Sequence, residues 1–99
     1  MNIAASPEPG QSRVQQGMIA VLFEKERKGV RPSIMNLKNE YREIVRTSFN
    51  AAMSGNLGLE IVVVTGDTAR IRSLEQQMLA QRGVQSVRLT LIPSGSAAT

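Results

Sequence analysis

Apolar positions along this chain follow two different periods, and the changes between them predict its elements. Residues 18–23 are an unbroken apolar run, which is typical of a strand that is buried on both faces. After a charged loop, apolar residues recur at three- and four-residue spacing and predict an amphipathic helix over about 32–45. Pro32 stands at the start of this helix, where its missing N–H costs nothing.

The second half of the chain predicts two more strands, a helix and a final strand. Alternation over 47–53 and a run rich in β-branched residues over 59–65 predict two strands. The short turn between them contains Gly and Asn, so these strands form a hairpin. A helix follows, with Asp67 or Thr68 as its N-cap, and alternation over 87–91 predicts the last strand.

The resulting order, β-α-β-β-α-β, predicts an α+β fold with ferredoxin-like topology. Right-handed crossovers then give one four-stranded antiparallel sheet with both helices on one face. We expect the folded domain to span 14–92. Residues 1–13 and 93–99 are small and polar, and we expect them to be disordered tails.

The two strands predicted at the centre of the sheet are apolar on both faces. Two helices can cover only one face, and soluble monomers rarely expose apolar patches above a few hundred Å². We therefore expect a second copy of the chain to cover the other face, which gives a homo-oligomer, either a dimer or a tetramer. The alternative is that the tails fold over it. We assign these side chains to the interface: Ile19, Val21, Phe23, Val62 and Val64.

Histidine and cysteine are both absent from the 99 residues. The chain therefore lacks the usual general base near neutral pH, the commonest nitrogen ligand for metals, and the thiolate. We expect no catalytic residues, no metal site and no cofactor. Because there is no disulfide framework, no signal-peptide pattern and no apolar run long enough to span a membrane, we expect a cytoplasmic protein without membrane contact.

The formal net charge of +4 comes from 12 Lys and Arg against 8 Asp and Glu, and these charges are spread along the chain. This pattern favours a solvated surface, and we do not expect direct DNA binding. The one dense cluster, 24–31, lies between the first strand and the first helix. Its basic side chains suit a carboxylate or phosphate, and its glycine gives backbone freedom. The candidate ligand-binding residues are Arg27, Lys28, Gly29 and Arg31. A plain exposed basic loop is the alternative.

Five segments together carry a resemblance to a known family: 17–22, 37–41, 59–66, 83–84 and 87–91. In their order and spacing they resemble the C-terminal regulatory domain of the bacterial nickel-responsive transcriptional regulators. The resemblance implies an ACT-like βαββαβ domain that forms tetramers and binds nickel at its subunit interfaces.

The same resemblance implies three histidines and one cysteine as the nickel ligands. In this chain the corresponding positions hold Asn39, Asn50, Ala52 and Gly58. None of these residues supplies the nitrogen and sulfur donors of a square-planar nickel site, so we predict that nickel is not bound. We also expect the family's N-terminal ribbon-helix-helix DNA-binding domain to be missing, since a polar tail precedes the first strand.

The function expected from the sequence is a non-catalytic regulatory, ligand-binding or oligomerisation module, related to transcriptional regulators but without nickel. Its expected partners are a second copy of the chain and a small anionic ligand or a protein. Two alternatives remain. A small ferredoxin-like enzyme needs a pocket with convergent polar groups, and direct nucleic-acid binding through a basic face needs a strongly salt-dependent affinity.

Overall fold

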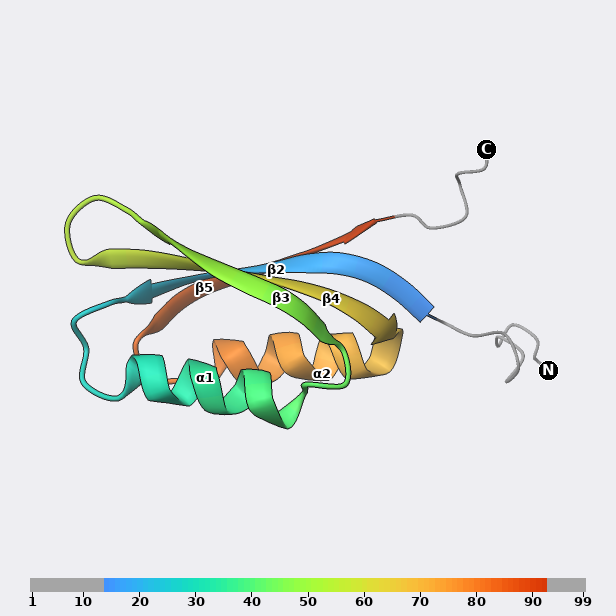
Figure 1. The fold of residues 1–99 in the computed structure, drawn as a ribbon. Coiled ribbons are helices and arrows are strands. Elements are labelled where there is room, and N and C mark those ends of the chain that lie inside the picture. The colour runs from blue at the N-terminus through green and yellow to red at the C-terminus, as the bar shows by residue number, and fades with distance from the viewer. Residues whose placement is uncertain (1–13, 93–99) are drawn as a thin grey trace.

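The computed structural model describes residues 14–92, which form a sheet layered on two helices (Figure 1). The predicted tails, 1–13 and 93–99, lie outside the described residues. The elements in chain order are β2 (Val14–Glu24), α1 (Val30–Glu40), β3 (Val45–Ala52), β4 (Leu57–Asp67), α2 (Thr68–Leu79) and β5 (Val84–Ile92).

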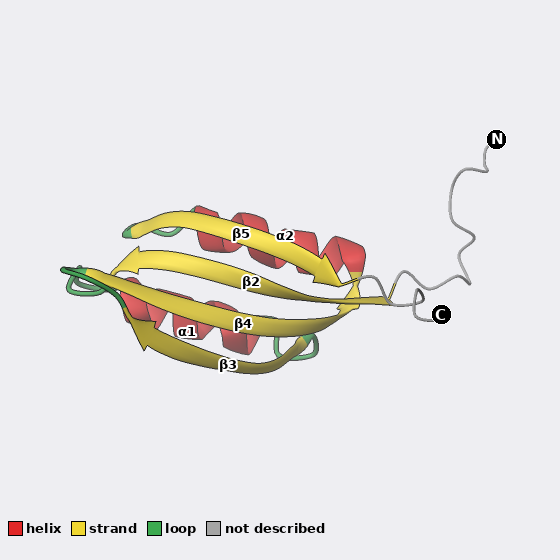
Figure 2. Ribbon diagram, turned by 90° about the horizontal axis from the view of Figure 1, so that it is seen from above, coloured by secondary structure: helices red, strands yellow, loops and turns green. Residues whose placement is uncertain are grey.

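The four strands form one antiparallel sheet in the order β3-β4-β2-β5. Both helices lie on the same face of this sheet, and no described element covers the other face (Figures 1 and 2). The α+β, ferredoxin-like and ACT-like fold predicted from the sequence is confirmed. Within the described residues, neither helix is long and apolar enough to cross a membrane.

The first helix is shorter than its apolar spacing predicts. The prediction runs over 32–45, whereas α1 ends at Glu40 and a turn follows. Tyr41 and Ile44 belong to that turn, and both side chains still enter the core, each with 3% exposure. They therefore continue the apolar spacing beyond the end of the helix. Ile44 lies over Gly66, where a Cβ would come within 2.5 Å of the Ile44 Cγ2. This glycine lets the turn approach the end of β4.

The hydrophobic core lies between the helices and the covered face of the sheet. The five side chains that we assigned to the interface are there, each between 0% and 2% exposed: Ile19, Val21, Phe23, Val62 and Val64. That assignment is wrong. Both faces of the central strands are apolar, so alternation defines two sets of side chains without saying which set meets the helices. The helices contribute six buried side chains that pack against these strand residues: Val30, Ile34, Leu37, Ile71, Leu74 and Met78.

The uncovered side of the sheet, here called the open face, is also apolar at its centre. Its side chains come from alternate positions of β2 and β4, where Met18 pairs with Val63 and Ala20 pairs with Ile61. Met18 is 40% exposed, and Phe49 on β3 is 55% exposed. The central members of the open face are Met18, Ala20, Leu22, Phe49, Leu59, Ile61 and Val63. The prediction of a second apolar face therefore stands, with these side chains in place of the five named above.

Polar contacts join the turn after α1 to α2. The Tyr41 hydroxyl lies 2.7 Å from the Ser73 Oγ, and the Arg70 guanidinium stands 4.0 Å from the centre of the Tyr41 ring. Arg70 Nε also donates to Glu43 Oε2 over 2.6 Å. This hydrogen bond from a cation lowers the pKa of Glu43 below its usual value. The two helices are thus joined by contacts at the solvent side of the core.

The reassigned faces predict losses of stability of different size for two neighbouring residues of β2. Ile19→Ala removes a fully buried side chain and should lower the free energy of unfolding by about 2–5 kcal/mol. Met18→Ala removes a side chain that is 40% exposed and should cost less than about 1 kcal/mol in dilute protein. Urea denaturation measures both, and equal losses would contradict the assignment of the faces.

Candidate functional site

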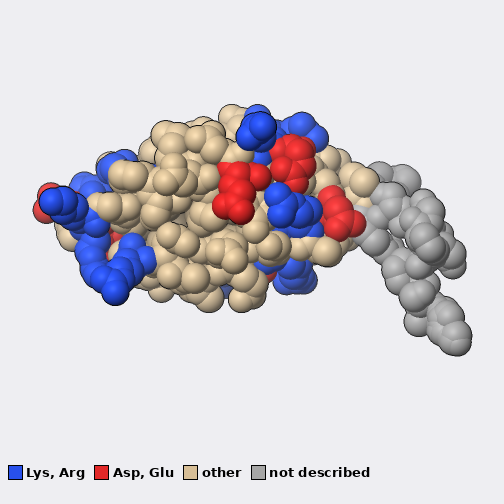
Figure 3. Space-filling model, turned by 90° about the horizontal axis from the view of Figure 1, so that it is seen from below, with Lys and Arg blue, Asp and Glu red and all other residues tan. Residues whose placement is uncertain are grey.

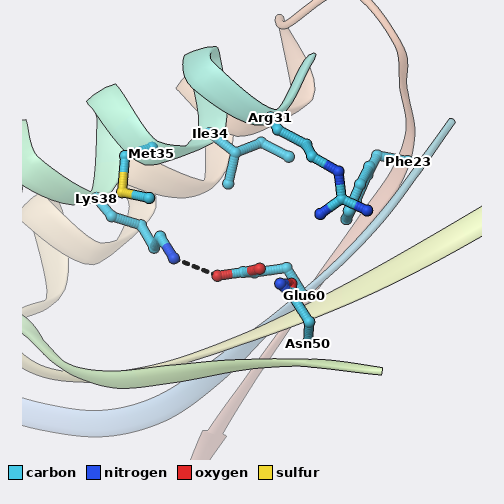
Figure 4. A pocket seen from close by; sticks show the side chains of 7 residues that line it. All are labelled: Phe23, Arg31, Ile34, Met35, Lys38, Asn50 and Glu60. Carbon is cyan, nitrogen blue, oxygen red and sulfur yellow. Dashed lines mark hydrogen bonds and ion pairs between the residues drawn. The ribbon is translucent and has the colours of Figure 1, made fainter. Parts of the chain in front are cut away.

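A pocket of about 150 Å³ lies between α1 and the covered face of the sheet, close to the β3 edge (Figure 4). Its walls combine apolar and polar side chains from four elements. The apolar ones are Phe23, Ile34 and Met35, and the polar ones are Arg31, Lys38, Asn50 and Glu60. Asn50 and Glu60 are paired across β3 and β4, so the ladder places them side by side. The pocket therefore joins convergent polar groups to an apolar surface.

An ion pair between Lys38 and Glu60 forms one side of this pocket. Glu60 is only 4% exposed, and a carboxylate this buried needs a partner because burial removes its water. Lys38 Nζ donates to Glu60 Oε2 and also to Ser48 Oγ, over 2.9 Å in the second bond. The ammonium group thus connects α1 to β3 and β4 at once.

Arg31 lies at the opposite side of the pocket. Its guanidinium stands over the Phe23 ring, 5.4 Å from the ring centre, which is within the range of a cation–π contact. Within residues 14–92 it makes no hydrogen bond or ion pair. Figure 4 shows the guanidinium and the Glu60 carboxylate on either side of the same hollow. The N–H groups of the Arg31 guanidinium are therefore available to donate hydrogen bonds to a molecule in the pocket.

The structure separates the four candidate ligand-binding residues of the β2–α1 loop. Only Arg31 lines the pocket described above. Lys28 and Gly29 border a second, more open hollow of about 250 Å³ on the far side of the α1 start. Arg27 faces the carboxylate of Glu24, with 3.4 Å between Nη1 and Oε1. Basic side chains do gather at one end of the molecule (Figure 3), but the four residues do not converge on one ligand.

Gly29 has a structural role that accounts for its place in the loop. It is the N-cap of α1 with φ of +87°, a left-handed conformation that L side chains adopt rarely. The backbone freedom predicted for Gly29 therefore serves the start of the helix.

Three of the four positions where the resemblance places metal ligands, Asn50, Ala52 and Gly58, lie on the β3–β4 ladder, and the fourth, Asn39, is an exposed residue of α1. Ala52 pairs with Gly58 in the β3–β4 ladder, two residues beyond the pair of Asn50 with Glu60. The space beside Gly58 is filled, because a Cβ there would lie 2.7 Å from Cζ of Phe23. Among the described residues, no group of three or more His, Cys, Asp or Glu could hold a metal ion.

Comparison with known families gives a direct match. The model of the NikR C-terminal nickel-binding domain matches residues 16–92. The chain belongs to this family. The predicted resemblance is thereby confirmed for the fold and the family.

Two relatives of the NikR family illustrate the level of similarity. "Putative nickel-responsive regulator 2" of Methanothermobacter thermautotrophicus is 36% identical over 74 residues, which cover 75% of this chain and 53% of the relative. "Putative nickel-responsive regulator 3" of Methanosarcina mazei is 28% identical over 75 residues, covering 76% and 54%. The chain spans about half the length of these curated relatives.

Solved structures with low sequence identity share the fold. An uncharacterized protein of Thermotoga maritima has a TM-score of 0.67 at 16% identity, covering 82% of this chain and 98% of that one. The ACT domain from the GTP pyrophosphokinase of Chlorobium tepidum has a TM-score of 0.64 at 17% identity, covering 78% and 99%. These two neighbours support the ACT-like architecture.

The family description names nickel, but the residues at the implied positions do not fit that metal. Two amides, a methyl group and a glycine stand at Asn39, Asn50, Ala52 and Gly58. Nickel in square-planar sites prefers imidazole and thiolate donors. In addition, the Phe23 ring occupies the space that a side chain at position 58 would need.

Sequence reasoning missed the buried ion pair of Lys38 and Glu60. Lys38 is one of several charged residues along the first helix, and its spacing alone does not distinguish it from the others. The available signal was Glu60 itself, the one charge inside the apolar run of 59–65 and in phase with the buried Val62 and Val64. A carboxylate in that phase requires a cation from the covering helix.

The ion pair predicts a large loss of stability when its cation is removed, and a recovery of most of that loss when the carboxylate is removed as well. Lys38→Met leaves Glu60 buried without its cation and should lower the free energy of unfolding by about 3–5 kcal/mol. The double variant Lys38→Met with Glu60→Met removes both charges and should recover most of that loss. Urea denaturation checks both variants.

A matched control comes from an exposed ion pair. Arg72 and Glu75 are three residues apart on α2, with 58% and 20% of their side chains exposed. Arg72→Met should change stability by less than about 1 kcal/mol. A double variant at 38 and 60 that is as unstable as Lys38→Met alone would rule out the ion pair as the cause.

Proposed function

We propose that this chain is a non-catalytic regulatory module of the nickel-responsive regulator family that responds to a signal other than nickel. The observation that carries the proposal is the set of residues at the four implied ligand positions, together with the Phe23 ring that fills the space beside Gly58. The family match and the names of the relatives support a regulatory role.

The absence of histidine and cysteine supports the non-catalytic part of the proposal. Lys38, a candidate base by type, is engaged with Glu60 and Ser48. A nucleophilic lysine is usually a desolvated amine in an apolar pocket, whereas Lys38 Nζ here donates hydrogen bonds to the Glu60 carboxylate and to Ser48. We propose the cytoplasm as the place of action, which agrees with a chain that cannot form disulfides.

We further propose that the module self-associates through its open face. The centre of that face is apolar over β2, β4 and β3, and an exposed patch of this kind marks an interaction surface. A second copy of the chain is the proposed occupant, since the face then becomes the shared core of a symmetric dimer or of a tetramer built from such dimers. On β5 the face ends in polar residues, Ser86, Arg88 and Thr90, which suit the rim of an interface.

The nickel part of the proposal is tested by calorimetry on tag-free protein. We expect no nickel binding at sub-micromolar affinity, because no imidazole or thiolate donor is present in the chain. Thermal denaturation with and without nickel gives a second readout, in which the melting temperature should not change. Stoichiometric sub-micromolar binding would overturn the proposal.

The assembly part is tested with two exposed apolar residues that differ in location. Phe49, 55% exposed, belongs to the open face, and Leu79, 50% exposed, lies on α2. We expect the wild type and Leu79→Glu to have an oligomeric mass by light scattering. Phe49→Glu should shift the mass toward the monomer, because it places a charge in the interface. A wild type that is monomeric at every concentration would overturn this part.

A further inference from the structure

The pocket beneath α1 contains a buried acceptor to which no residue of the described range 14–92 donates. Glu60 Oε2 accepts from Lys38, while Oε1 accepts no hydrogen bond from any residue within 14–92. The side chain is almost fully buried and borders the pocket. A buried carboxylate oxygen without a donor is costly, so this position favours a ligand that brings an N–H or O–H group.

Two unused polar groups face the same space. The Arg31 guanidinium stands over the Phe23 ring, and its N–H groups make no hydrogen bond or ion pair within residues 14–92. The Asn50 amide lines the pocket and makes no hydrogen bond within the described chain. The guanidinium fork matches the geometry of a carboxylate, which it binds through two parallel hydrogen bonds.

The charges of the pocket favour a single negative charge on the ligand. Lys38 and Glu60 form an ion pair with each other, so that within residues 14–92 the Arg31 guanidinium has no carboxylate as a partner. An incoming carboxylate is therefore attracted to the Arg31 side. The opposite side, where Glu60 Oε1 lies, favours a neutral or cationic donor.

The walls and the size of the pocket limit the ligand further. Phe23, Ile34 and Met35 offer apolar contact. The cavity of about 150 Å³ holds a molecule of roughly ten non-hydrogen atoms at most, since one water needs about 10–15 Å³. A nucleotide or a peptide is too large, and an inorganic anion leaves the apolar walls without contact.

We propose that this pocket binds a small aliphatic carboxylate that carries a hydrogen-bond donor next to its carboxylate group. The carboxylate meets Arg31, the donor meets Glu60 Oε1, and the hydrocarbon part lies against Phe23 and Met35. α-Hydroxy acids and α-amino acids share this chemistry. The inference rests on the proposed function in one respect, because it names the class of signal to which a nickel-independent module responds.

Binding of such a ligand would act on the position of α1. Arg31 and Lys38 belong to α1, while Asn50 and Glu60 belong to β3 and β4. A molecule held between Arg31 and Glu60 therefore adds a second connection between helix and sheet beside the Lys38 ion pair. Since it binds the folded state alone, it should also raise the melting temperature.

The experiment is a heteronuclear NMR titration of the full chain with three probes that share one carbon skeleton. Valine and α-hydroxyisovalerate carry the donor, and isovalerate lacks it. We expect the first two, or either of them, to shift amide resonances of α1, β3 and β4 around the pocket. Isovalerate should bind about tenfold more weakly, because Glu60 Oε1 stays without a donor.

Variants locate the binding. Arg31→Gln keeps an exposed polar side chain and should weaken binding of the best probe at least about tenfold by removing the charged fork. Arg72→Gln, an exposed arginine on α2, is the matched control and should leave binding unchanged. Thermal denaturation of both variants confirms that they fold.

Three results would overturn the inference: no shifts with any probe at millimolar concentration, isovalerate binding as tightly as the other two, or equal binding by Arg31→Gln. Each concerns the pocket alone. The proposed function fails through a different result, stoichiometric nickel binding, so the two failures are distinguishable.

Discussion

The fold depends on one geometric constraint. The two helices cover only one face of the sheet, whereas its central strands are apolar on both faces. β2 and β4 pair over their whole length, so each contributes one set of side chains to the core and one to the open face. The helices α1 and α2 cover one set, in which Ile19 and Val62 are fully buried, and leave a pocket near the β3 edge. The uncovered set has no partner within the described chain, which is why assembly enters the functional proposal.

The same constraint explains why the Lys38–Glu60 pair lies where it does. Glu60 is in phase with the buried set of β4, so its carboxylate points under α1 and away from water. Only a cation from the covering helix or from a neighbouring strand reaches it there. Lys38 reaches it from α1 and also binds Ser48 on β3. A charge in the core thus fixes the position of α1 over the β3–β4 side of the sheet, and the pocket forms beside that contact.

The order and number of elements could be predicted from the sequence, because periods of two and of three to four residues are local signals. The choice of the covered face could not, since Ile19 and Met18 are equally apolar and only the packing of helices distinguishes them. The helix boundary at Glu40 was missed because Tyr41 and Ile44 stay buried after the helix has ended. Of the candidate loop residues, Arg31 alone reaches the pocket, because Gly29 turns the chain and separates Arg27 and Lys28 from it.

Phe23 lies beside Gly58, one of the four implied ligand positions, and also lines the pocket. Its ring fills the space beside Gly58, so no side chain fits at that position while the ring stays in place. The other part of the ring supports the Arg31 guanidinium and forms an apolar wall of the cavity. A side chain at position 58 would require this ring to shift, because its Cζ lies 2.7 Å from where the new Cβ would be. A side chain at position 58 and the wall of the proposed carboxylate pocket therefore compete for the position of one aromatic ring.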